Sequence, residues 1–238
     1  AARFAADQGD YDEAARLGEE CLALRRELGE KLDIAGALTG LGVVLDMRGD
    51  HARAEGLFEE SLALARELGN RKRIASALNT LGISARHRGE PERAASLYEE
   101  SLALARELGD RWHTATTLLN LGNAYLDQGA LDEAMTQYRE TLPLARDLQN
   151  RQQVALCLQG MASVAVARGD AVRAARLSGA AAALREAIGL QLPAASRARL
   201  DKVAADACAA LGEATFTAAW AAGQVLSLDQ AVAEGLSD

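Results

Sequence analysis

Residues 71–110 read RKRIASALNT LGISARHRGE PERAASLYEE SLALARELGD, and this block carries the pattern that decides the fold. The pattern returns every 40 residues without a slip in register. Equivalent positions hold Leu38, Leu78, Leu118 and Leu158, then Ala54, Ala94, Ala134 and Ala174, then Phe58, Tyr98, Tyr138 and Ser178. A repeat of this length is typical of a solenoid, in which each unit buries its apolar face only against its neighbours. We therefore expect a chain that presents a binding surface and is not an enzyme.

The composition predicts an all-helical protein of the cytoplasm. The chain has 238 residues, of which 49% are hydrophobic, only 4% are aromatic and only 3 are proline. Cys21, Cys157 and Cys208 lack CxxC spacing, so we interpret them as small buried residues in a reducing compartment. No apolar run approaches the roughly 20 residues of a membrane span, and no signal peptide is visible. The net charge of −8 argues against direct binding of nucleic acid, because an acidic surface repels phosphates.

Each repeat divides into two helices that end at glycine. In residues 71–88, the apolar side chains of Ile74, Leu78 and Leu81 share one helical face, and Gly89 follows. Glycine enters the left-handed conformation of a helix stop without steric cost. The other predicted stops are Gly9, Gly49, Gly129 and Gly169 for the first helices, and Gly29, Gly69, Gly109 and Gly189 for the second.

A few residues mark or interrupt the helix boundaries. Asp10, Asp50 and Asp170 each follow a glycine stop and are predicted N-caps. Gln149 replaces the expected glycine, so we expect a looser turn there. Pro143 lies inside the preceding helix, removes one backbone hydrogen bond and should kink it.

The repeats cover residues 1–188, and residues 189–238 follow without the pattern. The full helix pairs are predicted at about 31–68, 71–108, 111–148 and 151–188. Residues 1–28 form a truncated pair, with a stub of first helix over 1–8 and a full second helix from Asp10. After Pro193, helices at about 194–211, 213–222 and 227–235 are predicted to cap the last apolar face. We expect one elongated domain that is a piece of a longer protein, since Ala1 lies in mid-pattern.

Two repeats show large and small residues in a fixed order: Leu78, Leu81, Gly82, Ala85, Ala94, Tyr98 and Ser101, then Leu118, Leu121, Gly122, Tyr125, Ala134, Tyr138 and Thr141. This order resembles the tetratricopeptide repeat. The resemblance implies an all-α solenoid of stacked antiparallel helix pairs, in which Gly82 and Ala94 let two helices cross closely. The period of 40 residues exceeds the usual length of about 34 and resembles the repeats of LGN-type proteins and kinesin light chains.

The tail is similar to that of another group with long repeats. GAAAALREAIG (Gly179–Gly189), the Trp220-x2-Gly223 motif and LSLDQAVA (Leu226–Ala233) resemble the end of the helical domain in MalT-like and LuxR-family regulators. These are large bacterial signal-transduction ATPases. The resemblance implies a regulatory domain that binds a protein, peptide or effector and passes its occupancy to an upstream nucleotide-switch domain.

The tetratricopeptide resemblance also implies that the first helices line a concave groove. The candidate groove residues are Asn79, Ile83, Arg86, Leu119, Asn123, Leu126 and Gln159. An Asn amide can donate to and accept from a peptide backbone, and Arg86 could pair with a carboxylate. The alternatives are a merely solvated inner face, or a semi-apolar wall that suits an amphipathic helix, a small effector or a neighbouring domain.

We expect no catalytic residue, no metal and no cofactor. His51, His87 and His113 are isolated in the sequence, and no nucleotide-binding or hydrolase motif is present. Two rivals of the regulator hypothesis stay open. The chain could be a stand-alone peptide-binding scaffold that uses Asn79, Arg86 and Asn123. It could also self-associate through an open N-terminal face, because the helix from Asp10 lacks a complete mate.

Overall fold

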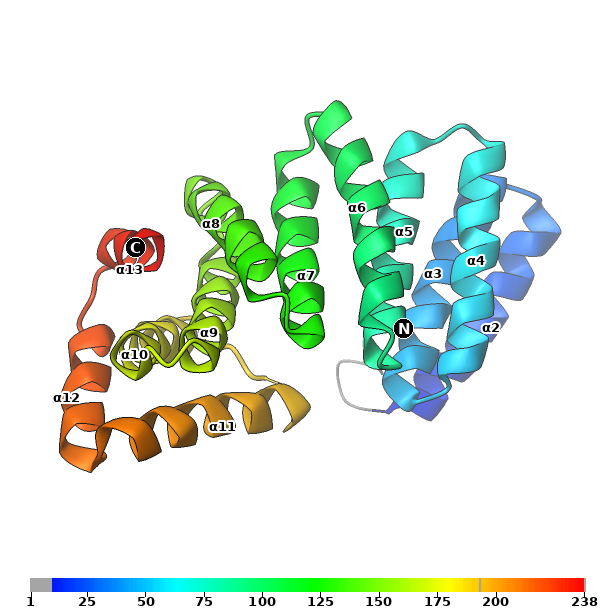
Figure 1. Cartoon of the computed structure of the whole chain (residues 1–238). Helices are drawn as coiled ribbons and strands as arrows, with labels where there is room; N and C mark the ends of the chain where they lie inside the picture. Colours follow the sequence, from blue (N-terminus) through cyan, green and yellow to red (C-terminus); the bar gives the residue numbers. More distant parts are fainter. Residues whose placement is uncertain (1–9, 193, 238) are drawn as a thin grey trace. The chain divides into compact units, whose positions relative to one another are not determined.

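The computed structural model describes residues 10–192 and 194–237 (Figure 1). Within these ranges all twelve elements are α-helices, and no strand is present. Consecutive helices pack against each other, which confirms the predicted all-α solenoid. The chain divides into two compact units, unit 1 over Ala1–Asp110 and unit 2 over Arg111–Asp238. The expected stub over residues 1–8, the stop at Gly9 and the break at Pro193 lie outside the described residues.

Unit 1 contains the five helices α2 (Tyr11–Leu28), α3 (Lys31–Arg48), α4 (His51–Glu67), α5 (Arg71–His87) and α6 (Pro91–Glu107). They alternate as second and first helices of the repeats. Their facing apolar stripes form one core, whose large members include Leu38, Leu41, Leu45, Phe58, Leu78 and Leu81. Burial of this shared core between neighbouring pairs is the main stabilising contribution in such a fold.

Glycine allows the close crossing of the two helices within a repeat. A Cβ atom on Gly82 would lie 2.5 Å from the ring of Tyr98, and one on Gly42 would lie 2.4 Å from the ring of Phe58. Ala94 is fully buried. Gly82 and Ala94 therefore lie at the helix crossing, as the sequence predicts, and at Gly82 only a hydrogen leaves room for the aromatic ring.

The predicted Asp N-caps form the expected hydrogen bonds at the helix starts, but the prediction of a looser turn at Gln149 is wrong. Asp10 and Asp170 accept hydrogen bonds from the backbone N–H of residues three positions later, at 3.1 and 3.0 Å. Gln149, however, does not loosen its turn. It adopts a left-handed φ of 54°, and the following N–H bonds Ala145 O at 2.9 Å, as its equivalent bonds Ala105 O at 3.0 Å. The hydrogen bonds of the turn thus override the steric preference of a non-glycine residue.

Unit 2 begins with four repeat helices, α7 (Arg111–Gln128), α8 (Leu131–Asp147), α9 (Arg151–Ala167) and α10 (Ala171–Ala187). Pro143 lies inside α8, which continues as α-helix for another turn. The core gathers around Tyr138, Leu142, Leu158 and Met161. Three more helices follow, α11 (Ala194–Leu211), α12 (Glu213–Gln224) and α13 (Leu228–Leu236).

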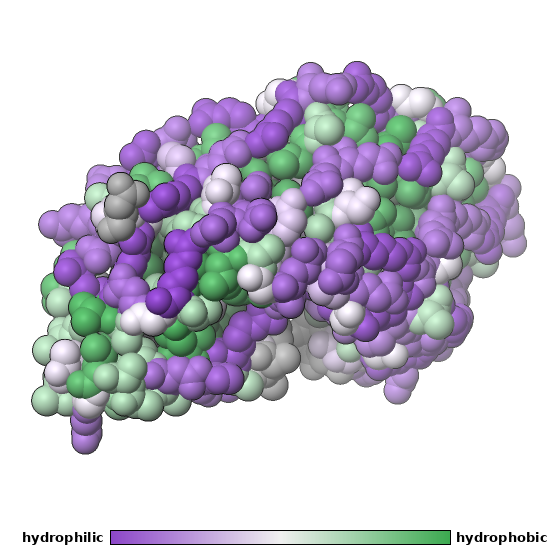
Figure 2. All heavy atoms as spheres, in the orientation of Figure 1, coloured by the Kyte–Doolittle hydropathy of each residue, from purple (hydrophilic) through white to green (hydrophobic). Residues whose placement is uncertain are grey.

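The last three helices pack onto the repeat helices of unit 2. α12 crosses α10 at two glycines: a Cβ on Gly223 would lie 2.0 Å from Arg176 O, and one on Gly179 would lie 2.2 Å from Trp220 O. α13 places Gly235 against side chains of α8 and α9. Figure 2 shows green and pale-green side chains gathered over the outer side of α12, at the lower left.

Candidate protein-binding surface

The candidate groove residues of unit 1 lie together on α5. Asn79 is only 8% exposed, whereas Ile83 and Arg86 are half-buried. Neither Asn79 nor Arg86 is free, since both interact with other groups of the chain. A peptide would therefore compete with contacts that already exist at these two residues.

The candidate residues of unit 2 lie on α7 and α9 and are largely part of the packing. Leu119 is 5% exposed and belongs to the core, and Leu126 packs against that core. The side-chain oxygen of Asn123 accepts a hydrogen bond of 2.9 Å from the Tyr138 hydroxyl. Gln159 is 8% exposed, and its Nε2 has no hydrogen-bond partner. The binding role of all seven residues stays a prediction.

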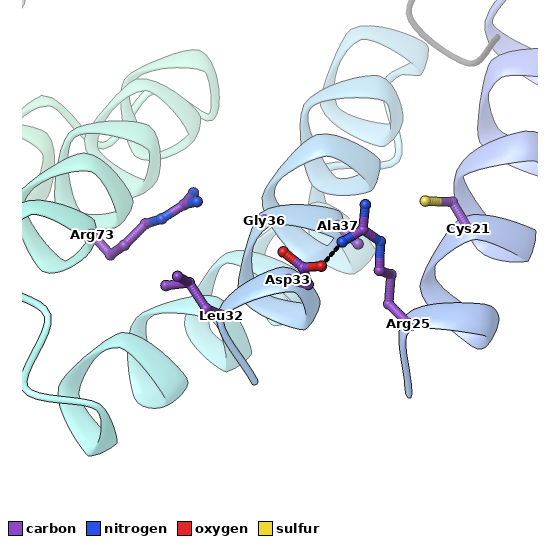
Figure 3. A pocket seen from close by; sticks show the side chains of 7 residues that line it. All are labelled: Cys21, Arg25, Leu32, Asp33, Gly36, Ala37 and Arg73. Carbon is purple, nitrogen blue, oxygen red and sulfur yellow. Dashed lines mark hydrogen bonds and ion pairs between the residues drawn. The ribbon is translucent and has the colours of Figure 1, made fainter. Parts of the chain in front are cut away.

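Unit 1 has two open hollows near the N-terminal ends of α3 and α5. The first has a volume of about 270 Å³ and is lined by Cys21, Arg25, Leu32, Asp33, Gly36, Ala37 and Arg73 (Figure 3). The second has a volume of about 300 Å³ and is lined by Asn70, Lys72, Arg73 and Ser76. Arg73 lines both hollows. In Figure 3 its side chain extends from α5 towards α3, and a Cβ on Gly36 would lie 3.7 Å from its Nη1.

Arg73 differs from the other cations around it because its guanidinium has no ion pair or hydrogen bond among the described residues. Arg26 and Arg66 each pair with a glutamate 34 residues later, at 2.7 and 3.1 Å. Lys72 lies 3.6 Å from Asp110. Arg25 in the first hollow pairs with Asp33. The hollows therefore contain one uncompensated positive charge.

The repeat pattern explains why Arg73 is unpaired. Arg25 and Asp33 form an ion pair in the first copy, and 40 residues later the same two positions hold Ala65 and Arg73. The cation now occupies the position of the acid, and an alanine occupies the position of its partner. Arg73 is not among the residues predicted from the sequence, although comparing these two repeat positions between copies identifies it.

A second polar cluster joins three helices of unit 1. Asp46 of α3 accepts hydrogen bonds from Nδ1 of His51 at 2.8 Å and Nδ1 of His87 at 2.9 Å. Burial alone would raise the pKa of the Asp46 carboxyl, but the hydrogen bonds from His87 and His51 outweigh it and lower that pKa. Two histidines that are isolated in the sequence are thus brought onto one carboxylate. Among the described residues no group of three or more His, Cys, Asp or Glu side chains is arranged to hold a metal.

The three cysteines are free thiols in different surroundings. Cys157 is fully buried, and burial raises the pKa of its thiol. Cys208 is half-buried, and Cys21 is exposed. The expectation that all three are buried is therefore wrong for Cys21, because the side of α2 on which it lies is uncovered.

The chain belongs to the tetratricopeptide repeat family, since the model of that family matches residues 1–67 and 73–147, more than half of the sequence. Among curated proteins, no sequence matches this chain. Several solved structures share the fold. BtubC (BKLC) from P. vanneervenii is 23% identical with a TM-score of 0.68, and the match covers 81% of this chain and 80% of that one.

Repeats of a putative kinesin light chain from Podosopora anserina are also similar. Two such structures are each 17% identical, with TM-scores of 0.65 and 0.63. The matches cover 79% and 80% of this chain, and 92% and 94% of those chains. At these identities the likeness shows the fold alone. No described helix is both long enough and apolar enough to cross a membrane.

Proposed function

We propose that the chain is a non-enzymatic scaffold that binds an acidic segment of a partner protein over Arg73 of unit 1. The observation that carries this proposal is the unpaired guanidinium between two adjoining hollows. Members of the tetratricopeptide repeat family generally bind proteins or peptides. In this proposal, the surface around Arg73 determines which partner the chain binds.

The chemistry of the hollows favours a carboxylate that is followed by an apolar group. A guanidinium offers parallel N–H donors that match the two oxygens of a carboxylate. Leu32 lies beside it and is 42% exposed, so an apolar side chain of the ligand gains contact area there. Gly36 also lines this hollow, and a Cβ atom there would lie 3.7 Å from Nη1 of Arg73, so the guanidinium lies directly over this part of α3.

The test is a binding titration with two labelled peptides, one of glutamate and leucine and one of glutamine and leucine. We expect only the glutamate peptide to bind, more weakly as salt is added. Arg73→Ala should weaken binding at least about tenfold, because hydrogen bonds to charged groups contribute about 1.5–3 kcal/mol. Arg73→Lys should recover part of the affinity, since lysine keeps the charge but lacks the fork.

Arg66→Ala is the matched control, because Arg66 is an exposed arginine that pairs with Glu100 and lies outside both hollows. Equal binding by wild type, Arg73→Ala and Arg66→Ala would overturn the proposal. Loss of binding on substitution of Asn79, Arg86 and Asn123, with no effect at Arg73, would instead favour the groove predicted from the sequence.

A second proposal concerns the wider protein, in which this chain is the regulatory part of a cytoplasmic bacterial signal-transduction ATPase. The support comes from the tail, whose motifs resemble those of MalT-like and LuxR-family regulators. Gly179 and Gly223 belong to these motifs and are the residues at which α10 and α12 contact each other. The complete coding sequence tests it. A nucleotide-binding domain upstream in the same reading frame is expected, and a frame without one would exclude the proposal.

A further inference from the structure

The short helix α13 packs into a groove on the repeat helices of unit 2 (Figure 1). It contacts α8, α9 and α10, and its buried residues are Ala231, Val232 and Gly235. Gly235 lies closest to the floor: a Cβ atom there would lie 2.6 Å from Leu142 of α8 and 3.1 Å from Leu158 of α9. We call the surface of α8, α9 and α10 that α13 covers the tail groove.

Two arginines of the tail groove hold the C-terminal end of α13. Nη2 of Arg173, on α10, donates hydrogen bonds to Gly235 O at 3.1 Å and Ser237 O at 2.5 Å. Nη2 of Arg139, on α8, donates to the same Ser237 O at 3.3 Å. The last carbonyl groups of a helix have no partner within that helix and carry the negative end of its dipole. The tail groove therefore binds the end of a helix through its main chain.

The repeat pattern shows that the positions of these two arginines hold an acid and a base elsewhere. In unit 1 Glu19 and Arg53 form an ion pair at 2.9 Å, and the next copy keeps both residue types. In unit 2 the position of the acid holds Arg139, and the position of the base holds Arg173. Arg173 makes no ion pair with the described residues and donates only to carbonyl oxygens. A carboxylate at the end of a bound helix would supply the acid that this copy of the repeat lacks.

α13 has only a small contact with the tail groove. It has nine residues, fewer than the roughly 12–15 that an isolated helix needs to be stable in water. Its three buried residues are an alanine, a valine and a glycine. Leu236 in its last turn is 39% exposed, and Val225, just before the helix, is 81% exposed. A partner helix that makes the same contacts would therefore compete with α13.

We propose that the tail groove is a second docking site, which binds a short partner helix that ends in a carboxylate, and that α13 occupies this site until such a partner displaces it. The partner helix needs a small residue where Gly235 lies, because Leu142 and Leu158 leave no room for a larger one. Its terminal carboxylate pairs with Arg173. The site belongs to unit 2 and is independent of the proposed function, which rests on Arg73 of unit 1.

The test uses a labelled peptide with the sequence of residues 227–238, SLDQAVAEGLSD, and measures its fluorescence anisotropy. The wild type should bind it weakly, because α13 occupies the groove. Val232→Glu should release α13 and raise the apparent affinity at least about tenfold, since that affinity grows with the fraction of chains whose site is open. Gly235→Leu should do the same through its clash with Leu142. Val225→Glu is the matched control and should bind like the wild type, because this side chain is exposed. Circular dichroism verifies that each variant is helical.

The role of Arg173 is tested in the Val232→Glu chain. Adding Arg173→Ala should weaken binding of the peptide at least about tenfold, because a hydrogen-bonded charge pair is lost. Arg168→Ala is the control: Arg168 also belongs to unit 2 but pairs with Asp132, so its loss should leave binding unchanged. A peptide that ends in asparagine amide in place of the terminal aspartate should bind more weakly than the acid.

Each outcome decides part of the proposal. Equal peptide binding by the wild type, Val232→Glu and Gly235→Leu would overturn it, because α13 would then not control access to the groove. Equal binding of the acid and the amide peptides would exclude recognition of a carboxylate by Arg173. Neither experiment involves Arg73, so this inference and the proposed function can fail independently.

Discussion

Gln149 is the one described non-glycine residue with a positive φ, and it occupies a helix stop that glycine fills in its equivalents. The left-handed conformation costs a residue with a Cβ atom about 1–2 kcal/mol. Glycine avoids this cost but loses about 0.5–1 kcal/mol more conformational entropy on folding. We therefore expect Gln149→Gly to raise the free energy of unfolding by about 0.5–1 kcal/mol, measured by urea denaturation. Gln149→Ala keeps the Cβ atom and should change little, and a loss of stability in the glycine variant would contradict this account.

Asp46 should make the free energy of unfolding of unit 1 depend on pH in the acidic range. Its pKa is lowered in the folded state, so the carboxylate stabilises the fold above the unfolded pKa of about 3.9, and this contribution is lost as the pH falls through the folded value. We expect Asp46→Asn to be less stable than the wild type at pH 7, with a difference that narrows towards pH 3. Urea denaturation at several pH values measures the difference. Asp12→Asn, at a 90% exposed side chain, is the control, and a difference independent of pH would contradict the prediction.

Single residues also show what the sequence could and could not predict. The roles of Gly82 and Ala94 follow from the repeat alone, because the column opposite them holds an aromatic residue. The exposure of Cys21 and the unpaired state of Arg73 could not be read from one copy. Both depend on a comparison between copies: Cys21 lacks the cover that its equivalents have, and Arg73 occupies the position of the acid Asp33 while Ala65 occupies that of Arg25.

At the scale of elements, the crossing of α10 and α12 depends on direct contact between backbones. A methyl group on Gly223 would meet Arg176 O at 2.0 Å, and backbone cannot move aside as a flexible side chain can. We expect Gly223→Ala to cost at least about 1–3 kcal/mol, with a changed fluorescence of Trp220 on the same helix. Thermal unfolding followed by circular dichroism and fluorescence measures both effects.

Gly56 provides the control for that substitution. It lies inside α4 with nothing within 4 Å of an added Cβ atom, so Gly56→Ala should stabilise the chain by about 0.5–1 kcal/mol. If Gly223→Ala and Gly56→Ala changed the thermal stability equally, the crossing of α10 and α12 would not depend on the absence of a side chain at Gly223.

Helix boundaries were predictable because glycine stops and Asp N-caps act within a few residues. Which side of a helix faces a groove was harder to predict. α7 carries Leu118, Leu119 and Leu121 in close succession, and all three are buried. A single apolar stripe therefore does not define its exposed side, and this is why Leu119 was predicted to face the groove but lies in the core.

At the scale of the whole molecule, the division into two units should be visible in unfolding. The cation–carboxylate pairs that link successive repeats, such as Arg26–Glu60, are about half exposed and contribute at most about 1 kcal/mol each. Stability then depends on the cores, which in a solenoid act mainly on their neighbours. Leu41 belongs to the core of unit 1 and Leu158 to that of unit 2. Replacing either by alanine should cost about 2–5 kcal/mol.

The two tryptophans, Trp112 and Trp220, both lie in unit 2, so fluorescence follows that unit while circular dichroism follows the helices of both. We expect Leu158→Ala to shift the fluorescence transition in urea to lower concentration. Leu41→Ala should shift the early part of the circular dichroism transition and leave the fluorescence midpoint nearly unchanged. If both variants moved both signals equally, the chain would unfold as one cooperative block, and coupling between the units would have to be as strong as the packing inside each.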